Sequence, residues 1–314
     1  MSLLSGKIIL DCDPGHDDAI AIILAYGSAE IDLLAITTVA GNQTLDKVTN
    51  NARAVSTVIG MTDTPIAAGS EKPLVQEIEV AGEIHGESGL DGPKLPKPTV
   101  PLSDVNAVDL IIETVMNNPS GTISLVATGS LTNVALAARK EPKIIKRVKE
   151  VVIMGGGYNT GNWSAVAEFN IITDPEAAHI VFNEDWKVTM VGLDLTHQAL
   201  ATQDVVTNIK SINTSTSNFI VELLEFFTDM YKQNQGFEAP PVHDPCTVAY
   251  LIDPSVVTTL SVPVDIELTG KLTRGMTVAD FRYPIPKENN TFVATKLNHT
   301  KFWDLIYDAL SNIG

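Results

Sequence analysis

Short apolar runs rich in β-branched residues alternate along this chain with stretches of helical periodicity, and this alternation constrains the fold more than any other feature. Five such runs are predicted strands, at residues 7–10, 33–39, 123–127, 151–154 and 188–191. Strands that alternate with helices are typical of a mostly parallel sheet covered by helices. Such strands are buried on both faces, which explains why these runs are apolar throughout instead of at every second residue.

Three further runs near the C-terminus are separated by turn residues and predict a small antiparallel addition, at residues 262–268, 276–280 and 291–295. The chain has no internal repeat and no convincing linker, and α/β domains often reach its length of 314 residues. We therefore expect residues 1–314 to form one α/β domain, an open sheet flanked by helices. The Pro- and Gly-rich segment 68–106 is long for a plain connection and predicts a functional loop or lid.

Acidic residues dominate the charge of the chain. The formal net charge of −17 disfavours nucleic acid as a partner because phosphate groups would be repelled. No apolar run is long enough to span a bilayer and no signal peptide is recognisable, so we expect a cytoplasmic protein without a membrane partner. The two cysteines, Cys12 and Cys246, are too few for a disulfide framework and are expected to be reduced.

Four aspartates lie within eight residues directly after the first predicted strand: Asp11, Asp13, Asp17 and Asp18. Asp11 and Asp13 point to one side of an extended chain, and Pro14–Gly15 then turns the chain into a helix that is expected to begin near Asp17. Four like charges at one strand end repel one another unless protons or a cation neutralise them. Oxygen ligands of this kind favour Ca²⁺ or Mg²⁺ over zinc.

Two residues elsewhere could complete such a cation site. Thr128 follows the strand predicted at 123–127, and Asp244 precedes an apolar helix predicted over 247–252. Each also has an ordinary interpretation as the cap of the next helix. The four acids could likewise form a solvated turn, although this is common for two acids and unusual for four.

The segment 11–19, Asp-Cys-Asp-Pro-Gly-His-Asp-Asp-Ala, resembles the signature Asp-x-Asp-Pro-Gly-x-Asp-Asp-Ala of the inosine-uridine nucleoside hydrolase family. Further blocks similar to this family follow in its order, at residues 39–42, 84–86, 154–156, 167–170, 174–177 and 242–244. Because the blocks keep their order and spacing over nearly the whole chain, the combination is specific. The resemblance implies the nucleoside hydrolase fold and the hydrolysis of ribonucleosides to ribose and free base.

The resemblance also implies a Ca²⁺ ion held by the side chains of Asp13, Asp18 and Asp244 and by the main-chain carbonyl of Thr128. By the same resemblance, Asp13 is the general base for a calcium-bound water that attacks the anomeric carbon. Calcium acidifies water less than zinc does, so a carboxylate that touches both ion and water is needed. The transition state resembles an oxocarbenium ion, which nearby acids stabilise.

Further site residues follow from the resemblance. The departing base needs a proton, and His243 is the expected donor because the usual pKa of histidine is near neutrality, with His85 as second candidate. Glu168 and Asn170 flank Phe169, so strand-like alternation would aim both at one side. The remaining histidines, His16, His179, His197 and His299, are expected to be structural. The residues expected to bind substrate are Asp17, Asn42, Met154, Asn162, Glu168 and Asn170, with Tyr231 and Gln235 as tentative base-pocket residues. The aromatic residues Trp163, Phe169, Tyr231 and Phe237 could form walls around the base, although such residues are as often packed in the core.

Two other functions compete with nucleoside hydrolysis. An Mg²⁺-assisted phosphohydrolase could use Asp11 or Asp13 as nucleophile, but Gly15 stands where that chemistry would have Thr or Val. A calcium-dependent nucleoside binder without turnover could use the same acids to hold a sugar. Base preference is open, because it depends on loops around 75–95 and 225–242 that match the family least. The resemblance implies a homotetramer.

Overall fold

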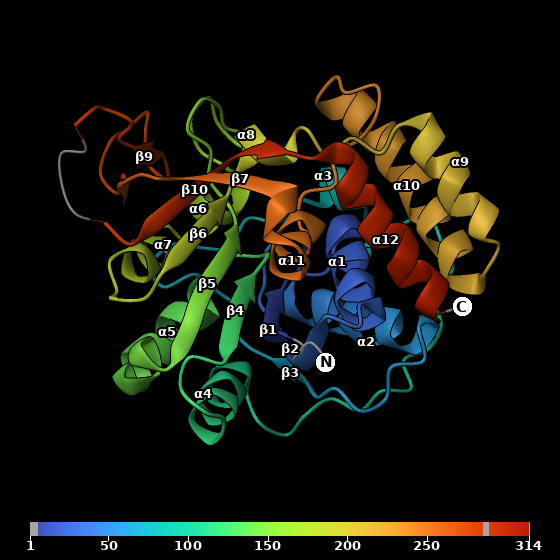
Figure 1. Cartoon of the computed structure of the whole chain (residues 1–314), viewed down its shortest axis with the longest axis horizontal. Coiled ribbons are helices and arrows are strands. Elements are labelled where there is room, and N and C mark those ends of the chain that lie inside the picture. The colour runs from blue at the N-terminus through green and yellow to red at the C-terminus, as the bar shows by residue number, and fades with distance from the viewer. Residues whose placement is uncertain (1–5, 285–288, 314) are drawn as a thin grey trace.

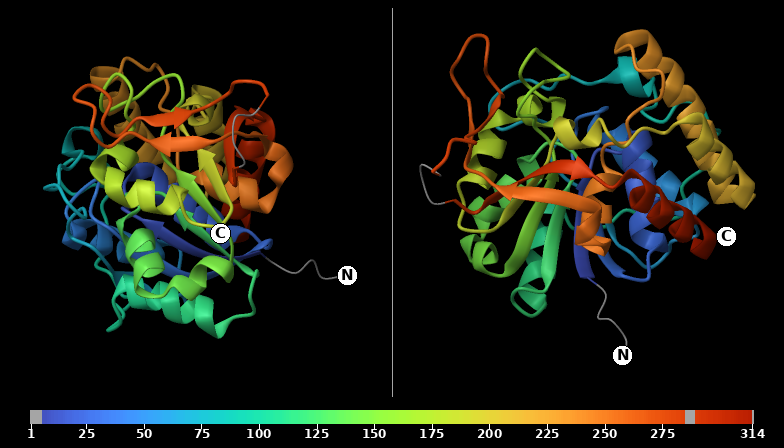
Figure 2. Two further views of the ribbon diagram at one scale, coloured as in Figure 1. Left: turned by 90° about the vertical axis from the view of Figure 1, so that its left-hand side faces the viewer. Right: turned by 45° about the horizontal axis from the view of Figure 1, so that its top comes forward.

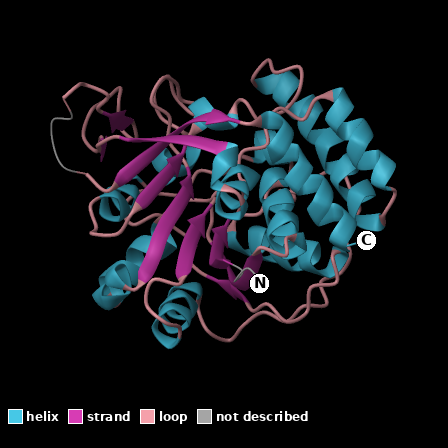
Figure 3. Cartoon of the chain, in the orientation of Figure 1, coloured by secondary structure: helices cyan, strands magenta, loops and turns pink. Residues whose placement is uncertain are grey.

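The computed structural model describes residues 6–284 and 289–313. At its centre lies an eight-stranded sheet with the order β3-β2-β1-β4-β5-β6-β10-β7 (Figures 1 and 3). Neighbouring strands are parallel except β7 and β10, so the prediction of a mostly parallel sheet is confirmed. The strands are β1 (Gly6–Cys12), β2 (Ile31–Thr38), β3 (Ile66–Ala68), β4 (Ile123–Ala127), β5 (Val148–Met154), β6 (Val188–Val191), β7 (Val257–Ser261) and β10 (Thr291–Leu297).

The antiparallel addition is smaller than the sequence predicted. It consists of β8 (Val264–Ile266) and β9 (Thr277–Ala279), and Pro263 separates it from β7. The run 291–295 was expected to belong to this addition, and that expectation is wrong, because β10 pairs in parallel with β6 in the main sheet. The physical reason is burial, since Val293 and Ala294 are packed into cores on opposite faces of the sheet.

Helices cover both faces of the sheet (Figures 1 and 3). On one face the core includes α1, α2, α11 and α12, with α9 and α10 outside them, while α4, α5 and α7 pack on the other face. Figure 2 shows the segment around β9 at the opposite end of the molecule from α9 and α10. The helices are α1 (His16–Gly27), α2 (Leu45–Val58), α3 (Gly82–His85), α4 (Ala107–Asn117), α5 (Thr132–Lys140), α6 (Phe169–Thr173), α7 (Pro175–Phe182), α8 (Leu193–Thr196), α9 (Gln203–Ile212), α10 (Ser215–Asn234), α11 (Pro245–Ile252) and α12 (His299–Ile313), with short 3-10 turns at Pro142–Lys146 and Pro254–Val256.

The side chains of β1 show why the predicted strands are apolar throughout. Ile8 and Leu10 pack in the core with α1 and α12, whereas Ile9 packs in the core with α4 and α5. Both faces of the strand are therefore buried, as in other parallel sheets that carry helices on both sides. None of the described helices combines the length and the apolar character that crossing a membrane requires.

The strand order reverses between β1 and β4. From β1 the chain proceeds to β2 and β3 on one side of this point, and from β4 to β5 and β6 on the other. In open α/β sheets, ligands bind outside the carboxyl ends of the strands at such a switch point. The aspartates that follow β1 and the residue Thr128 that follows β4 lie at this position.

Candidate active site

The turn between β1 and α1 folds the acidic segment back on itself. The backbone N–H of Gly15 donates to Oδ2 of Asp18 at 3.0 Å, so Asp18 closes the first turn of the helix that begins at His16. An acid in the first turn also interacts favourably with the helix dipole. Position 15 requires glycine, because a Cβ there would lie 2.5 Å from Nδ1 of His85.

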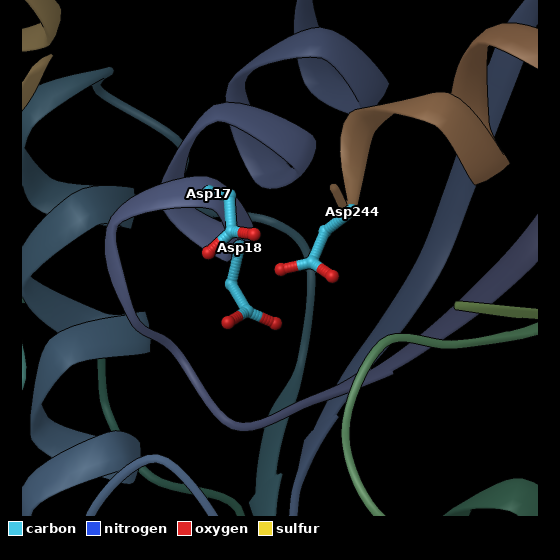
Figure 4. Close-up of side chains that lie close together, drawn as sticks. All are labelled: Asp17, Asp18 and Asp244. Atoms are coloured by element: carbon cyan, nitrogen blue, oxygen red, sulfur yellow. The ribbon is translucent and has the colours of Figure 1, made fainter. Parts of the chain in front are cut away.

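Three carboxylates converge beside this turn. Asp17 and Asp18 at the start of α1 and Asp244 at the start of α11 each offer an oxygen within 4.8 Å of the others (Figure 4). Asp244 precedes the first residue of α11 but its side chain makes no capping hydrogen bond, so it does not serve as an ordinary helix cap. The backbone N–H of His243 donates to Oδ2 of Asp17 at 3.2 Å and ties the two segments together.

Asp13 is buried next to this cluster between two glycines. Its Oδ2 accepts the backbone N–H of Asn42 at 2.7 Å, while its Oδ1 is buried and accepts no hydrogen bond from any described residue. A Cβ at Gly41 would lie 2.0 Å from Oδ2, and one at Gly129 would lie 2.8 Å from Oδ1. A buried carboxylate oxygen without a partner is costly, and a cation ligand is a role that fits it.

Thr128 connects the end of β4 to the same cluster. Its hydroxyl donates to Oδ1 of Asp18 at 2.8 Å, and its carbonyl oxygen accepts from the side-chain amide of Asn170 at 2.8 Å. A carbonyl oxygen has two lone pairs, so this one can also ligate a cation. The donors gathered here are carboxylate and carbonyl oxygens, which suit a hard divalent ion.

Burial and mutual repulsion raise the pKa values of the clustered acids. Burial is the main cause for each of them, and it raises the pKa of Asp17 to about 7 and the pKa of Asp18 to about 6. The pKa values of Asp13 and Asp244 are raised well above their usual range, with neighbouring aspartates as the next cause. Protons or a cation must therefore compensate these charges, and a divalent ion would do so at neutral pH.

A pocket opens above this cluster. Its empty space, including the open mouth, is about 590 Å³, and a concave site with a few polar groups is typical of small-molecule binding. Asp13 and Asp18 do not line the pocket, but they hydrogen-bond to Asn42 and Thr128, which do. The other residues predicted for the site all line it: Asp17, Asn42, His85, Thr128, Met154, Asn162, Glu168, Asn170, Tyr231, Gln235, His243 and Asp244.

Glu168 and Asn170 reach the pocket for a reason other than the predicted one. The extended conformation ends at Glu168, which caps α6, and Asn170 lies in the first turn of that helix. The Glu168 carboxylate accepts the backbone N–H of Gly156 at 2.9 Å, and Asn170 donates to the Met154 carbonyl at 3.0 Å. Burial raises the pKa of Glu168 to about 7.

Asn162 lines the pocket and also has a structural contact. Its Oδ1 accepts the backbone N–H of Phe169 at 2.9 Å, which holds the loop against α6. Its amide nitrogen makes no hydrogen bond with another described residue, so this one side chain can hold the loop and still offer a donor to a ligand.

His243 lies between two hydroxyl groups. Its Nδ1 is 2.7 Å from the Thr196 hydroxyl and its Nε2 is 2.7 Å from the Tyr231 hydroxyl. Burial lowers the pKa of His243 to about 3, so its ring is neutral at neutral pH. A neutral ring can offer a proton only from its N–H group, which differs from the imidazolium that the usual pKa of histidine suggested.

Several wall residues were missed or misplaced by sequence reasoning. Ala81, Glu83 and Ile84 line the pocket, and the only signal for them was their place beside His85 in the predicted loop or lid. Trp163 and Phe169, considered as walls, do line it. Phe237, considered with them, is not a lining residue and packs edge-on against Tyr231 and His197.

Comparison of the sequence and of the structure with known proteins identifies the family to which the chain is similar. A family profile described as "Inosine-uridine preferring nucleoside hydrolase" matches residues 8–304. The chain is 60% identical to a protein of that name from Crithidia fasciculata and 58% identical to one from Leishmania major, in each case with 98% of both chains covered. Among solved structures, a purine-preferring ribonucleoside hydrolase from Gardnerella vaginalis superposes with a TM-score of 0.91 at 32% identity, covering 98% of both chains.

Proposed function

Since the chain belongs to the inosine-uridine preferring nucleoside hydrolase family and is an enzyme that hydrolyses ribonucleosides, we propose that it does so with Ca²⁺ as cofactor and Asp13 as general base. The observation that carries this proposal is the unpartnered Oδ1 of buried Asp13 beside the converging carboxylates of Asp17, Asp18 and Asp244. Both products, ribose and free base, are neutral small molecules that an acidic pocket does not trap.

Asp13, Asp18, Asp244 and the carbonyl of Thr128 would hold the cation. Three carboxylates and a carbonyl leave room for water and ribose hydroxyls within the six to eight oxygens of a calcium shell. When bound, the ion supplies a fixed positive charge that orders water and sugar hydroxyls. Asp17 is the third member of the converging group, and we assign it to a ribose hydroxyl because it lines the pocket and because the resemblance gives the cation to Asp13, Asp18 and Asp244.

Asp13 would take the proton from the attacking water through Oδ1. Its other oxygen is occupied by the Asn42 N–H, so the carboxylate cannot rotate freely. Gly41 and Gly129 pack against it on two sides, which holds its position within the tolerance that proton transfer demands.

The ribose would be held by Asn42, Asn162, Glu168 and Asn170, which line the pocket. Their oxygens and amide groups match sugar hydroxyls, which both donate and accept. As the glycosidic bond breaks, positive charge develops on the ribose. The buried acids of this site stabilise that charge more strongly than acids in water would.

The base would leave at the side of the pocket formed by His85, Tyr231, Gln235 and His243. The neutral ring of His243 and the hydroxyl of Tyr231 form one hydrogen-bonded chain that can pass a proton to the leaving base. This assignment keeps His243 as the expected proton donor and uses its N–H group. Uridine and inosine are the substrates we expect, because the relatives with about 60% identity carry the name inosine-uridine preferring.

The phosphohydrolase alternative fits the pocket poorly. The lining residues include Asp17, Glu83, Glu168 and Asp244 but no lysine or arginine that could bind a phosphate group. The alternative of a binder without turnover is decided by experiment.

The test is release of ribose from a panel of purine and pyrimidine nucleosides, measured as reducing sugar with and without a chelator. We expect hydrolysis of uridine and inosine, loss of activity in the chelator and recovery with added Ca²⁺. Tight nucleoside binding without any ribose release would support the binder instead, and full activity after complete metal removal would refute the calcium role. The homotetramer and the cytoplasmic location stay predictions, which light scattering and cell fractionation can measure.

A further inference from the structure

We propose that His16 is a positioning residue for His85 and thereby for the base of the substrate. This inference rests on the proposed function, since it names a further residue that acts in the same site. The sequence favoured a purely structural role for His16. The contacts of its ring connect it instead to the wall of the pocket.

Both nitrogens of the His16 ring have defined neighbours. Nε2 is 2.8 Å from the carbonyl oxygen of Asp91. A carbonyl oxygen can only accept, so Nε2 carries a proton and the ring is oriented with Nδ1 toward His85. The ring is fully buried between Phe226 and Phe227, with centroid distances of 5.2 and 5.0 Å and interplanar angles of 5° and 4°. Its orientation is therefore held by hydrogen bonding and by stacking together.

Two nitrogens of His16 lie beside one ring nitrogen of His85, and the tautomer of His85 decides which of them it pairs with: a protonated Nδ1 donates to the His16 ring, and an unprotonated Nδ1 accepts the His16 backbone N–H. Nδ1 of His85 lies 3.2 Å from Nδ1 of His16 and 3.3 Å from the backbone nitrogen of His16. No described residue hydrogen-bonds to Nε2 of His85, and His85 lines the pocket. One ring nitrogen of His85 is thus held by the protein, and the other is left for a bound base.

The backbone next to His85 is also held by hydrogen bonds. Four carbonyl groups of the turn after α3 each accept from a side chain of α1, of α2 or of the segment before α2. These pairs are Gln43 to Gly86, Lys47 to Glu87, Asn51 to Ser88 and His16 to Asp91. The predicted lid is therefore, in this part, a wall fixed to α1, α2 and the segment before α2, and His16 is the donor among these four whose ring also stacks on the His85 ring.

Two amide substitutions separate the two contacts of His16. Asparagine places its amide near the position of Nδ1, so His16→Asn keeps a partner for His85 and loses the Asp91 contact. Glutamine reaches the position of Nε2, so His16→Gln keeps the Asp91 contact and loses the ring contact with His85, leaving His85 only the backbone N–H of residue 16. His16→Leu loses both, and His299→Gln is a matched control, since His299 accepts from Trp303 and contacts the Leu200 carbonyl away from the pocket.

The decisive experiment is a double-mutant cycle with His85→Ala, read as kcat and KM on uridine and inosine. We expect His16→Leu and His16→Gln to lower kcat/KM by about 10- to 100-fold, the range for a misplaced group at a reacting centre. His16→Asn should restore most of this loss, and His299→Gln should stay close to the wild type. In the His85→Ala background, His16→Leu should cost less than about threefold, because the residue through which it acts is gone.

An equal loss from His16→Leu with and without His85 would overturn the inference, since that result indicates a packing role alone. Thermal unfolding of each variant shows whether it is folded. If His16→Leu is not folded, the comparison of His16→Asn with His16→Gln is the test. The affinity of each variant in the cycle for uridine is also measured by calorimetry, which needs no turnover. Absence of ribose release by the wild type would therefore refute the proposed function, while the affinity cycle still decides the role of His16.

Discussion

Replacing Asp13 by Asn is the substitution for which the structure predicts the most specific outcome. Asn has the same size and can keep the contact of Oδ2 with the Asn42 N–H, which is 2.7 Å long. The amide nitrogen then takes the place of Oδ1, the buried oxygen that accepts no hydrogen bond from the described residues. A donor at that position can neither ligate a cation nor take a proton from water.

The expected loss follows from these two roles. General base catalysis contributes about 10²- to 10⁴-fold, which corresponds to about 3–5 kcal/mol of transition-state stabilisation. We expect kcat for uridine to fall by at least this range at saturating Ca²⁺, measured as ribose release. The variant should at the same time unfold at a higher temperature than the wild type in the presence of a chelator, because one buried charge of the cluster has been removed.

Asp11→Asn is the matched control two residues earlier. The Asp11 carboxylate is also buried with one unpartnered oxygen, while its other oxygen accepts from Thr37 at 2.6 Å and Asn133 at 2.8 Å. Burial raises the pKa of Asp11 to about 7, so Asn resembles a form that is already populated at neutral pH. We expect kcat to change by less than about threefold. Equal kcat losses in both variants, or a loss below tenfold in Asp13→Asn, would refute the assignment of Asp13.

Three further predictions concern the same site. The pKa values of Asp17 and Asp18 are raised to about 7 and about 6, above the value of about 3.9 in an unfolded chain. The metal-free protein should therefore lose stability as pH rises from about 4 to about 7. The increase in unfolding temperature on adding Ca²⁺, measured by scanning fluorimetry, should be larger at pH 8 than at pH 5. Gly41→Ala should lower kcat by about 10²-fold, since the new Cβ would lie 2.0 Å from Oδ2 of Asp13; unchanged ribose release would contradict the tight packing of that carboxylate. His243→Ala should lower kcat for uridine by about 10²-fold or more. It should lower kcat much less for a riboside whose leaving group is stable as an anion, and equal losses of kcat on both substrates would exclude His243 as a proton donor.

The strands of the central sheet were predictable because their signal is local. β4 and β6 have the predicted boundaries, since both faces of each strand are buried and every residue contributes to the apolar run. The role of β10 was not predictable from its own residues. Its parallel partner β6 lies about a hundred positions earlier in the chain, and pairing over such a separation leaves no trace in a short window.

The residues of the site also differ in this way: some were recognisable from their neighbours in the sequence, and others only from contacts with distant parts of the chain. The aspartates that follow β1 were identified by their spacing, because four acids in eight residues demand compensation whatever the rest of the fold does. The contact between His16 and His85 joins residues 69 positions apart, so an isolated histidine gave no reason to assign it a role. Glu168 and Asn170, predicted to bind substrate, both line the pocket, but a helix that begins at Phe169 places them there instead of the predicted strand.

The hydrogen bond from the His243 backbone to Asp17 spans 226 positions of the chain. During synthesis the acidic turn leaves the ribosome long before Asp244, which completes the converging carboxylates. Domains fold as units when their last segments become available. A nascent or truncated chain that ends before α11 would therefore hold the acids without their closing partner, and we expect the proposed cation site to form only once α11 is in place.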